Sequence, residues 1–560
     1  MRRIDQIADQ YVTDVIAMSP MTATGLGVAG HDDSFDDLSP DGEAAAADLS
    51  RRTLAQLDRT EPCDERERVA KEAMQERLGL DLERYDAGDT YLGLNVINSG
   101  VHGVRQTFDM MSTEGADNAA NIAKRLAKVP EAFRQYTATL RAEAAAGRVA
   151  ARRQVTEVAN HCDNWNGAAG ADFWQGLADR IRVDGAAPTG GLAADLAAGV
   201  SAARQATAEF ATFLRDELAG QAPVKDAVGA QRYPRASRYF LGAEVDLAET
   251  YAWGWQELHR IETEMAAVAD RIKPGATVDE AVAMLDADPN QIVHDKDEFR
   301  AWMQQLADAT IADMAANHFD IPEPVRRIEC MIAPTSDGAI YYTGPSEDFS
   351  RPGRMWWSVP EAQDSFAKWR EVTTIYHEGV PGHHLQVGQT AYRSELLNRY
   401  QRQLLWCSGH GEGWALYSER LMDELGYLSD PANKLGMLDG QGFRAARVII
   451  DIGVHLELPI PADNPFGFAP GQVWNAELAW EFLRAHCRME EDMLRFELNR
   501  YLGWPGQAPS YKVGERLWMQ AREDYRARKG ADFSLRRFHT DALNLGSLGL
   551  DPFRRALSRL

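Results

Sequence analysis

Apolar positions recur at three- and four-residue spacing through most of the 560-residue chain, which is the pattern of amphipathic helices. Short segments rich in Gly and Pro interrupt this pattern at 183–191, 220–234 and 322–324. Helices are predicted before residue 320 at 64–85, 119–146, 193–219, 244–272 and 296–316. They are predicted after residue 360 at 365–378, 390–406, 410–426, 433–450, 472–499 and 511–528. The sequence therefore predicts a mainly α-helical protein.

A different pattern lies between residues 327 and 360. β-forming and turn residues occur there in the runs IECMIAP, GAIYY and PGRMWWSVP, which predict two or three strands of a small sheet. A chain of this length exceeds the usual size of one hydrophobic core. We therefore expect an N-terminal helical lobe at 1–225 and a second helical lobe at 226–560 that contains the sheet, although both could form one continuous domain.

The excess of acidic residues makes some binding partners of the protein improbable. The formal net charge is −24, from 84 acidic and 60 basic residues, and such a surface repels phosphate backbones and anionic lipids. We therefore expect neither nucleic-acid nor membrane binding. The first residues, MRRIDQ, precede no apolar signal segment, and no apolar run approaches the ~20 residues of a membrane span. The five cysteines are scattered without a CxxC pair, so the prediction is a cytoplasmic protein with free thiols.

The run HEGVPGHHLQ at 377–386 carries the candidate chemistry. Zinc hydrolases use imidazole and carboxylate ligands, and a further carboxylate takes the proton of the metal-activated water. The common helical solution is His-Glu-x-x-His, which places both histidines on one face. His377 and Glu378 match its beginning. The sequence predicts His377 as a ligand and Glu378 as the general base.

The motif is stretched relative to that helical solution. Position 381 is proline, and the next histidines, His383 and His384, come six and seven residues after His377. Gly379, Pro381 and Gly382 break or redirect a helix, which would let His383 return beside His377. We favour His383 as the second ligand and assign His384 to substrate binding or support, but the spacing leaves this choice open.

A carboxylate on a following helix is expected to complete the site. The segment HGEGWALYSE at 410–419 offers Glu412 between two glycines, which allow close approach of neighbouring backbones. Glu419 lies two turns later on the same helical face. We assign Glu412 to the metal and Glu419 to the support of a ligand histidine. The predicted motif region is therefore 377–419.

The runs HEGVPGHHLQ and GEGWALYSE resemble the bacterial family known as domain of unknown function 885 (DUF885), which is grouped with thermolysin-like (gluzincin-type) zinc metallopeptidases. RPGRMWWSVP, RVIIDIGVHLE, PGQAPSYKVGERL and FHTDALNLGSLGL extend the resemblance over most of 330–550. The resemblance implies one zinc per chain, a two-lobed, clamshell-like helical body and amide hydrolysis. Many members are exported lipoproteins, a location that we do not carry over because no signal peptide is visible.

Further residues are candidates for substrate contacts. In related helical zinc peptidases a tyrosine downstream of the ligands stabilises the oxyanion, and Tyr511 is similar in position. His455 is a second candidate, with Asp451 four residues earlier on the same helical face. A substrate carboxylate could be bound by Arg351, Arg447 or Lys512.

The resulting expectation is a zinc-dependent hydrolase of short peptides, similar to a carboxypeptidase or dipeptidase. A hydrolase of a non-peptide amide or ester is one alternative, because fold and metal do not fix the substrate. A non-catalytic helical binding protein with a remnant metal site is another. The oligomeric state, monomer or homodimer, stays open.

Overall fold

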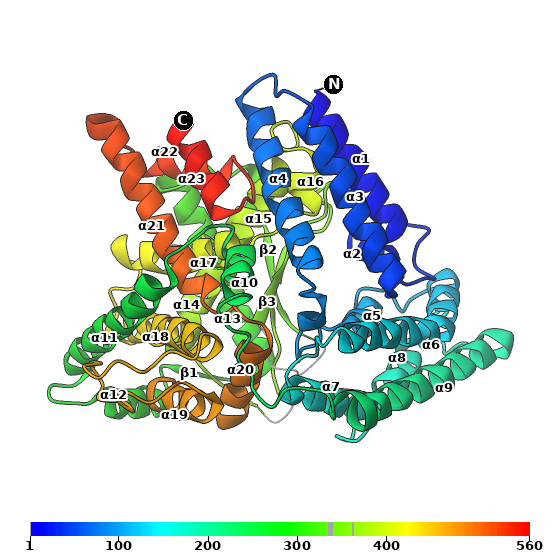
Figure 1. The fold of residues 1–560 in the computed structure, drawn as a ribbon. Coiled ribbons are helices and arrows are strands. Elements are labelled where there is room, and N and C mark those ends of the chain that lie inside the picture. Colours follow the sequence, from blue (N-terminus) through cyan, green and yellow to red (C-terminus); the bar gives the residue numbers. More distant parts are fainter. Residues whose placement is uncertain (1, 334–339, 361–362) are drawn as a thin grey trace. The chain divides into compact units, whose positions relative to one another are not determined.

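A computed structural model describes residues 2–333, 340–360 and 363–560, and these residues are mainly helical, as predicted (Figure 1). They divide into two compact units. One unit comprises the chain up to Glu61, Leu78–Ala227 and Leu502–Trp504. The other comprises Pro62–Arg77, Val228–Tyr501 and Pro505–Leu560. The assignment of lobes to 1–225 and 226–560 stays a prediction.

The first unit is entirely helical apart from its connections. It contains α1 (Arg3–Met18), α2 (Pro20–Gly25), α3 (Pro40–Asp58), the end of α4 (Glu65–Asp86), η1 (Thr90–Gly93), α5 (Gly100–Asp109), α6 (Ala116–Ala145), α7 (Arg152–Trp165), α8 (Phe173–Arg180), α9 (Gly190–Phe213) and η2 (Leu214–Leu218). Its core lies where α6 packs along α9. A Cβ atom on Gly199 would lie 2.7 Å from the Cβ of Leu126, so glycine permits this close helix contact.

The second unit contains the remaining helices. These are α10 (Tyr233–Leu241), α11 (Leu247–Ile272), α12 (Val278–Asp286), α13 (Lys296–Asn317), η3 (Glu323–Arg326), α14 (Lys368–Glu378), α15 (His383–Tyr392), α16 (Arg399–Gln403), α17 (Ser408–Glu424), α18 (Pro431–His455), α19 (Ala476–His486), most of α20 (Glu491–Gly503), α21 (Ser510–Lys529), η4 (Gly530–Asp532), α22 (Leu535–Leu543) and α23 (Leu550–Arg559). The helices predicted at 390–406 and 472–499 are each interrupted. Within 390–406 a new helix, α16, begins after Asn398, whose side chain caps it by accepting a hydrogen bond from the backbone amide of Gln401.

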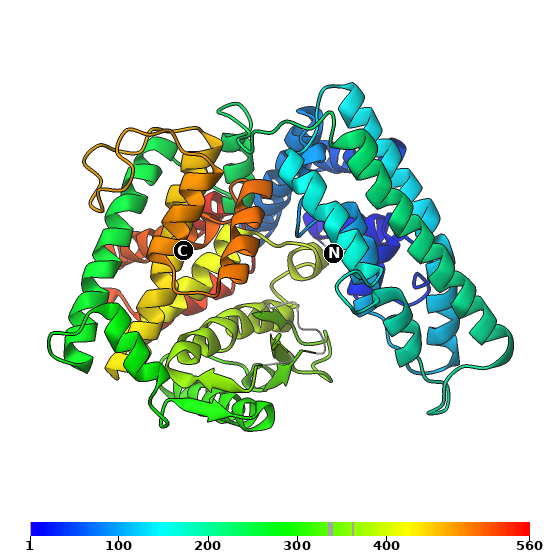
Figure 2. The same cartoon turned by 90° about the horizontal axis from the view of Figure 1, so that it is seen from below.

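A three-stranded sheet follows α13, as predicted. Its order is β2 (Ile328–Ile332), β4 (Gly353–Trp357) and β3 (Ile340–Thr343), with β4 parallel to β2 and antiparallel to β3. Pro334, Gly338 and Ala339, which belong to the predicted runs, lie outside the described residues. Figure 2 shows the sheet layered between α13 and the helices that carry the histidines.

A second, two-stranded sheet was not predicted. It pairs β1 (Ile292–His294) with β5 (Ser365–Ala367), where a helix start was expected. Each strand has three residues, too few for a recognisable alternation. Burial of Phe366, whose ring stacks on Phe299 with centroids 4.1 Å apart, favours the extended conformation here.

Helix α17 is the centre of the packing that positions the candidate site. It packs against α14, α18 and α21. Gly413 faces Gly514 of α21, and a Cβ atom on Gly413 would lie 2.5 Å from the Gly514 carbonyl carbon. The glycine after Glu412 therefore permits close backbone approach, which is the role expected from the sequence. No helix in the described part of the chain is long and apolar enough to span a membrane.

Candidate metal centre

The stretched motif folds back on itself between two helices. Helix α14 ends at Glu378, and α15 begins at His383. The amide of Gly382 donates to the carbonyl of Tyr376 at 3.0 Å, and a Cβ atom on Gly382 would lie 1.9 Å from the His377 carbonyl oxygen. Only glycine fits this return. It brings the rings of His377 and His383 together, with centroids 4.9 Å apart.

Helix α17 holds this loop and also supplies the acidic residue. The indole nitrogen of Trp414 donates to the carbonyls of Pro381 at 2.8 Å and Gly382 at 3.1 Å. The Ser418 hydroxyl donates to the Pro381 carbonyl at 3.2 Å. Glu412 lies earlier on the same helix. The position of the carboxylate is therefore linked to the position of the histidine loop.

The three predicted ligands converge. Oε2 of Glu412 lies 3.5 Å from Nε2 of His377 and 3.5 Å from Nε2 of His383, and the three ligand atoms all lie within 4.8 Å of one another. A separation of 3.5 Å exceeds the range of a good N–H···O hydrogen bond. Two atoms bound to one tetrahedral zinc lie about 3.4 Å apart, given bonds of about 2.1 Å. The spacing and the donor set therefore fit one shared zinc ion.

The electrostatics of the cluster also favour a cation. Burial lowers the pKa of His377, but its contacts with Glu412 and Glu419 outweigh burial and raise it to about 9. Burial raises the pKa of Glu412, but His383 and His377 hold it well below its usual range. Burial raises the pKa of Glu378, whose Oε2 has no hydrogen-bond partner within the described residues. Glu412 and Glu419 thus stabilise positive charge at the two histidines.

Glu419 supports His377, in the place assigned to it from the sequence. Its Oε1 lies 2.7 Å from Nδ1 of His377, a hydrogen-bond distance. Its Oε2 accepts from the amide nitrogen of Gln441 at 3.1 Å. Nε2 of His377 is therefore the nitrogen that faces Glu412.

His384 points away from the cluster. Its Nε2 hydrogen-bonds the Val325 carbonyl at 2.8 Å, and its Nδ1 hydrogen-bonds the Tyr342 hydroxyl at 2.9 Å. Burial lowers the pKa of His384 to about 4, so the ring is neutral. Both nitrogens are engaged by the protein. The structure thus brings His383, and not His384, to His377 and Glu412.

Tyr511 lies next to the cluster, whereas Arg447 is enclosed behind it. Burial and the charge of Glu412 raise the pKa of the half-buried Tyr511. The Arg447 guanidinium lies 4.7 Å from the centre of the Tyr511 ring and donates to Glu497 at 2.9 Å and to the Tyr501 hydroxyl at 2.8 Å. Arg447 is 5% exposed, and its guanidinium is already engaged by Glu497 and Tyr501, so its assignment to a substrate carboxylate stays a prediction.

The other two basic candidates differ from each other. Lys512 is 1% exposed and paired with Glu515 at 2.5 Å and Glu257 at 3.1 Å, so its assignment to substrate binding is wrong. Arg351 is half-buried and lies close enough to Tyr342 to lower the pKa of that phenol, although burial raises it overall. Its guanidinium donates at 3.5 Å to the Pro352 carbonyl and has no carboxylate partner within the described ranges.

His455 and Asp451 do not form the predicted pair. Nε2 of His455 donates to the Tyr501 carbonyl at 3.0 Å, and burial lowers the pKa of His455 to about 4. The neutral ring thus has no second N–H for an oxyanion. Asp451 instead accepts hydrogen bonds from the Tyr233 hydroxyl at 2.6 Å and the Gly506 amide at 2.9 Å. Asp451 therefore bonds to residues distant in the chain, although His455 lies only four residues away on the same helix.

Sequence reasoning missed Gln441 and Tyr342. Gln441 begins a polar row on α18 that continues with Arg444, Arg447, Asp451 and His455 at three- and four-residue spacing. This buried polar face in an otherwise apolar helix was a usable signal. Tyr342 offered none, since nothing in a short strand indicates that its hydroxyl reaches His384.

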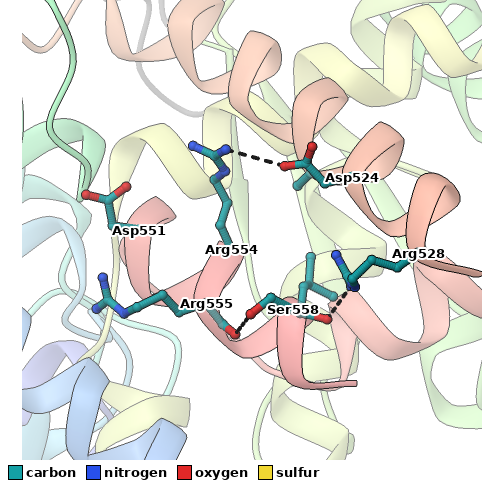
Figure 3. A pocket seen from close by; sticks show the side chains of 8 residues that line it. Asp524, Arg528, Asp551, Arg554, Arg555 and Ser558 are labelled. Atoms are coloured by element: carbon teal, nitrogen blue, oxygen red, sulfur yellow. Dashed lines mark hydrogen bonds and ion pairs between the residues drawn. The ribbon is translucent and has the colours of Figure 1, made fainter.

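A separate pocket of about 330 Å³ lies beside α21 and α23 (Figure 3). Its charged side chains largely pair with each other or with backbone. Arg554 contacts Asp524 at 3.4 Å, and Arg528 donates to the Leu557 carbonyl at 2.6 Å. None of the predicted site residues lines it.

Asp451 makes stability pH-dependent. Burial raises the pKa of its carboxyl to about 7, against the lowering effect of Tyr233 and Gly506. An unfolded aspartate titrates near 4, so the folded protein binds this proton more tightly, and the free energy of unfolding falls as pH rises from about 4 through 7. Asp451→Asn keeps an acceptor and cannot ionise. Relative to wild type, the variant should gain stability as pH rises, by up to roughly 4 kcal/mol near pH 8.

Urea unfolding at several pH values measures this difference. Asp463→Asn, at an exposed position, is the control for removal of one carboxylate. A difference between Asp451→Asn and wild type that stays constant from pH 4 to 8 would contradict a buried ionisation at this position.

Two solved structures are similar to the chain over nearly its whole length. One, described as a putative lipoprotein from Colwellia psychrerythraea, is 22% identical, with 99% of this chain and 98% of that chain covered and a TM-score of 0.84. Another, described as a putative lipoprotein of unknown function from Shewanella oneidensis, is 17% identical, with 99% of each chain covered and a TM-score of 0.73. These likenesses show the fold. No curated protein matches the chain.

The comparisons contradict the prediction of a cytoplasmic location, because both solved relatives are described as lipoproteins. That prediction rested on absences, namely of an apolar leader and of cysteine pairs. Such absences do not identify a compartment.

The family model described as a bacterial protein of unknown function, DUF885, matches residues 20–557. This range includes both histidines and Glu412 of the cluster, together with Glu378, Glu419 and Tyr511. The match extends over nearly the full sequence and agrees with the motifs that first indicated the resemblance. The chain belongs to the DUF885 family.

Proposed function

We propose that this protein is a zinc-dependent hydrolase of peptide bonds in short peptides, related in mechanism to the thermolysin-like metallopeptidases. The observation that carries the proposal is the pair of 3.5 Å separations between Glu412 and the two histidines, beside the buried carboxylate of Glu378. His377, His383 and Glu412 would hold one zinc per chain. When bound, zinc supplies a Lewis acid that polarises an amide carbonyl and acidifies water.

Glu378 is suited to proton transfer. Its carboxylate is buried beside the histidines, and its Oε2 has no hydrogen-bond partner among the described side chains. It would take the proton from the water whose oxygen bonds to the carbonyl carbon. It would then deliver this proton to the leaving amine. Burial raises the pKa of Glu378, which makes its carboxylate a better acceptor for the proton of the water.

Tyr511 is the candidate donor to the developing oxyanion. Its phenol lies within electrostatic reach of Glu412, and burial raises its pKa, so the hydroxyl keeps its proton at neutral pH. A neutral phenol can donate a hydrogen bond to the oxygen on which charge develops. Arg447 packs against the ring of Tyr511 and limits its movement.

Arg351 supports the carboxypeptidase- or dipeptidase-like part of the proposal. Of the three basic residues considered, Arg447 and Lys512 are paired with buried carboxylates, whereas Arg351 has no such partner within the described part of the chain. Arg351 lies near Tyr342, which in turn lies within electrostatic reach of Glu378. A guanidinium in this position could bind the terminal carboxylate of a peptide.

Two matched substitutions test the proposed roles of the carboxylates. Glu378→Gln should retain roughly one zinc per chain and lower kcat for a peptide mixture by about 10²- to 10⁴-fold, because it removes the proton acceptor. Glu412→Gln should lower the zinc content, because a neutral amide is a poorer ligand. Metal analysis and peptide cleavage are measured on the same samples.

Loss of zinc in both variants would contradict the separate roles. Zinc without cleavage of any peptide by wild type would redirect the search to a non-peptide amide or ester. Absence of zinc from wild type after loading would contradict hydrolysis by this site and favour the non-catalytic binding protein.

Arg351→Met tests recognition of the terminal carboxylate. The variant should lower kcat/KM for a blocked dipeptide with a free carboxylate by about 10- to 100-fold, which corresponds to a hydrogen bond to a charged group. It should leave cleavage of the matching amide unchanged. Arg354→Met is the control, because the Arg354 guanidinium is already paired with Glu329 at 2.6 Å. Equal losses for the acid and the amide would contradict the role of Arg351.

A further inference from the structure

A buried series of side chains leads from Lys512 to His377. Nζ of Lys512 lies 2.5 Å from Oε1 of Gln441, and Nε2 of Gln441 lies 3.1 Å from Oε2 of Glu419. Oε1 of Glu419 lies 2.7 Å from Nδ1 of His377. The four residues lie on α21, α18, α17 and α14, and each is at most 4% exposed.

The chemistry of these groups fixes the direction of every hydrogen bond. An ammonium group can only donate, so Lys512 must face the oxygen of the Gln441 amide. The amide nitrogen of Gln441 must then face the other way, toward Glu419. The Glu419 carboxylate accepts that bond and can only accept from His377. Nδ1 of His377 therefore carries its proton in this arrangement.

The proton on Nδ1 determines whether Nε2 of His377 is free to bind a metal. With the proton held at Nδ1, Nε2 of neutral His377 presents a lone pair, and Nε2 is the atom 3.5 Å from Glu412. His383 lacks such support, because its Nδ1 is buried without a hydrogen-bond partner in the described residues. The protein thus determines the tautomer of one of the two histidines.

Lys512 is itself held in place. Its ammonium is paired with Glu515 at 2.5 Å and with Glu257 of α11 at 3.1 Å. The second amide hydrogen of Gln441 is directed to the Leu416 carbonyl at 3.5 Å. These contacts oppose rotation of the Gln441 amide, which would reverse the donor order.

We infer that Lys512 and Gln441 are positioning residues that set the ligand tautomer of His377 through Glu419, and thereby raise the affinity of the site for zinc. This inference rests on the proposed zinc site, but concerns residues that neither touch the metal nor contact substrate. It also gives Lys512 a different role from the one predicted from sequence.

The test is zinc affinity, measured by competition with a chelator, for wild type, Lys512→Met, Gln441→Met and the double variant. Each single substitution should weaken zinc binding by about 10- to 100-fold, the usual effect of removing support from a ligand. The zinc affinity of the double variant should equal that of the single variant that binds zinc less tightly, because both substitutions interrupt the same series of hydrogen bonds. The visible absorption of the cobalt(II)-loaded variants should also change, since it reports the geometry of the ligands.

Lys434→Met is the matched control. Lys434 is paired with Glu264 at 3.0 Å and Asp423 at 3.1 Å, but lies outside the series, so zinc affinity should stay as in wild type. If Lys512→Met does not fold, Gln441→Met still tests the inference, because it leaves the Lys512 ion pairs in place. Tight zinc binding by wild type and unchanged affinity in folded Gln441→Met would overturn the inference and leave the proposed hydrolase intact. No zinc binding by wild type would overturn both.

Discussion

Carboxylates that are withdrawn from water need positive charge or hydrogen-bond donors nearby, because an unpaired buried charge costs several kcal/mol. Glu378 and Glu419 are buried in the candidate centre, and only 16% of the Glu412 side chain is exposed. Two imidazoles lie among these three acids. A doubly charged ion would balance them better than one imidazolium proton, and the arrangement of donors behind His377 leaves a lone pair for such an ion.

This charge arrangement depends on close backbone packing. The return of the chain at Gly382 is too tight for any side chain, and it brings His383 beside His377. Trp414 and Ser418 hold the loop through its carbonyl groups, and Gly413 lets α17 approach α21. One helix thus fixes the loop, supplies Glu412 and Glu419, and sets the distance to Tyr511. Displacement of α17 would change all of these contacts together.

The sequence predicted the features that are encoded within short segments of the chain. Helical periodicity, the β-forming runs and the stretched motif of His377 all appear within short segments. The choice between His383 and His384 could not be made locally, because it depends on Val325 and Tyr342. The hydrogen bonds of Asp451 and Arg447 could not be predicted for the same reason. Their partners, Tyr233 and Glu497, lie 218 and 50 residues away in the chain.

The most direct test of the central claim is anomalous diffraction at the zinc absorption edge from crystals of the zinc-loaded protein. The account predicts one strong peak within bonding distance of His377 Nε2, His383 Nε2 and Glu412, and none at His384. A peak bonded to His384, or no peak at the cluster in a zinc-loaded crystal, would contradict it.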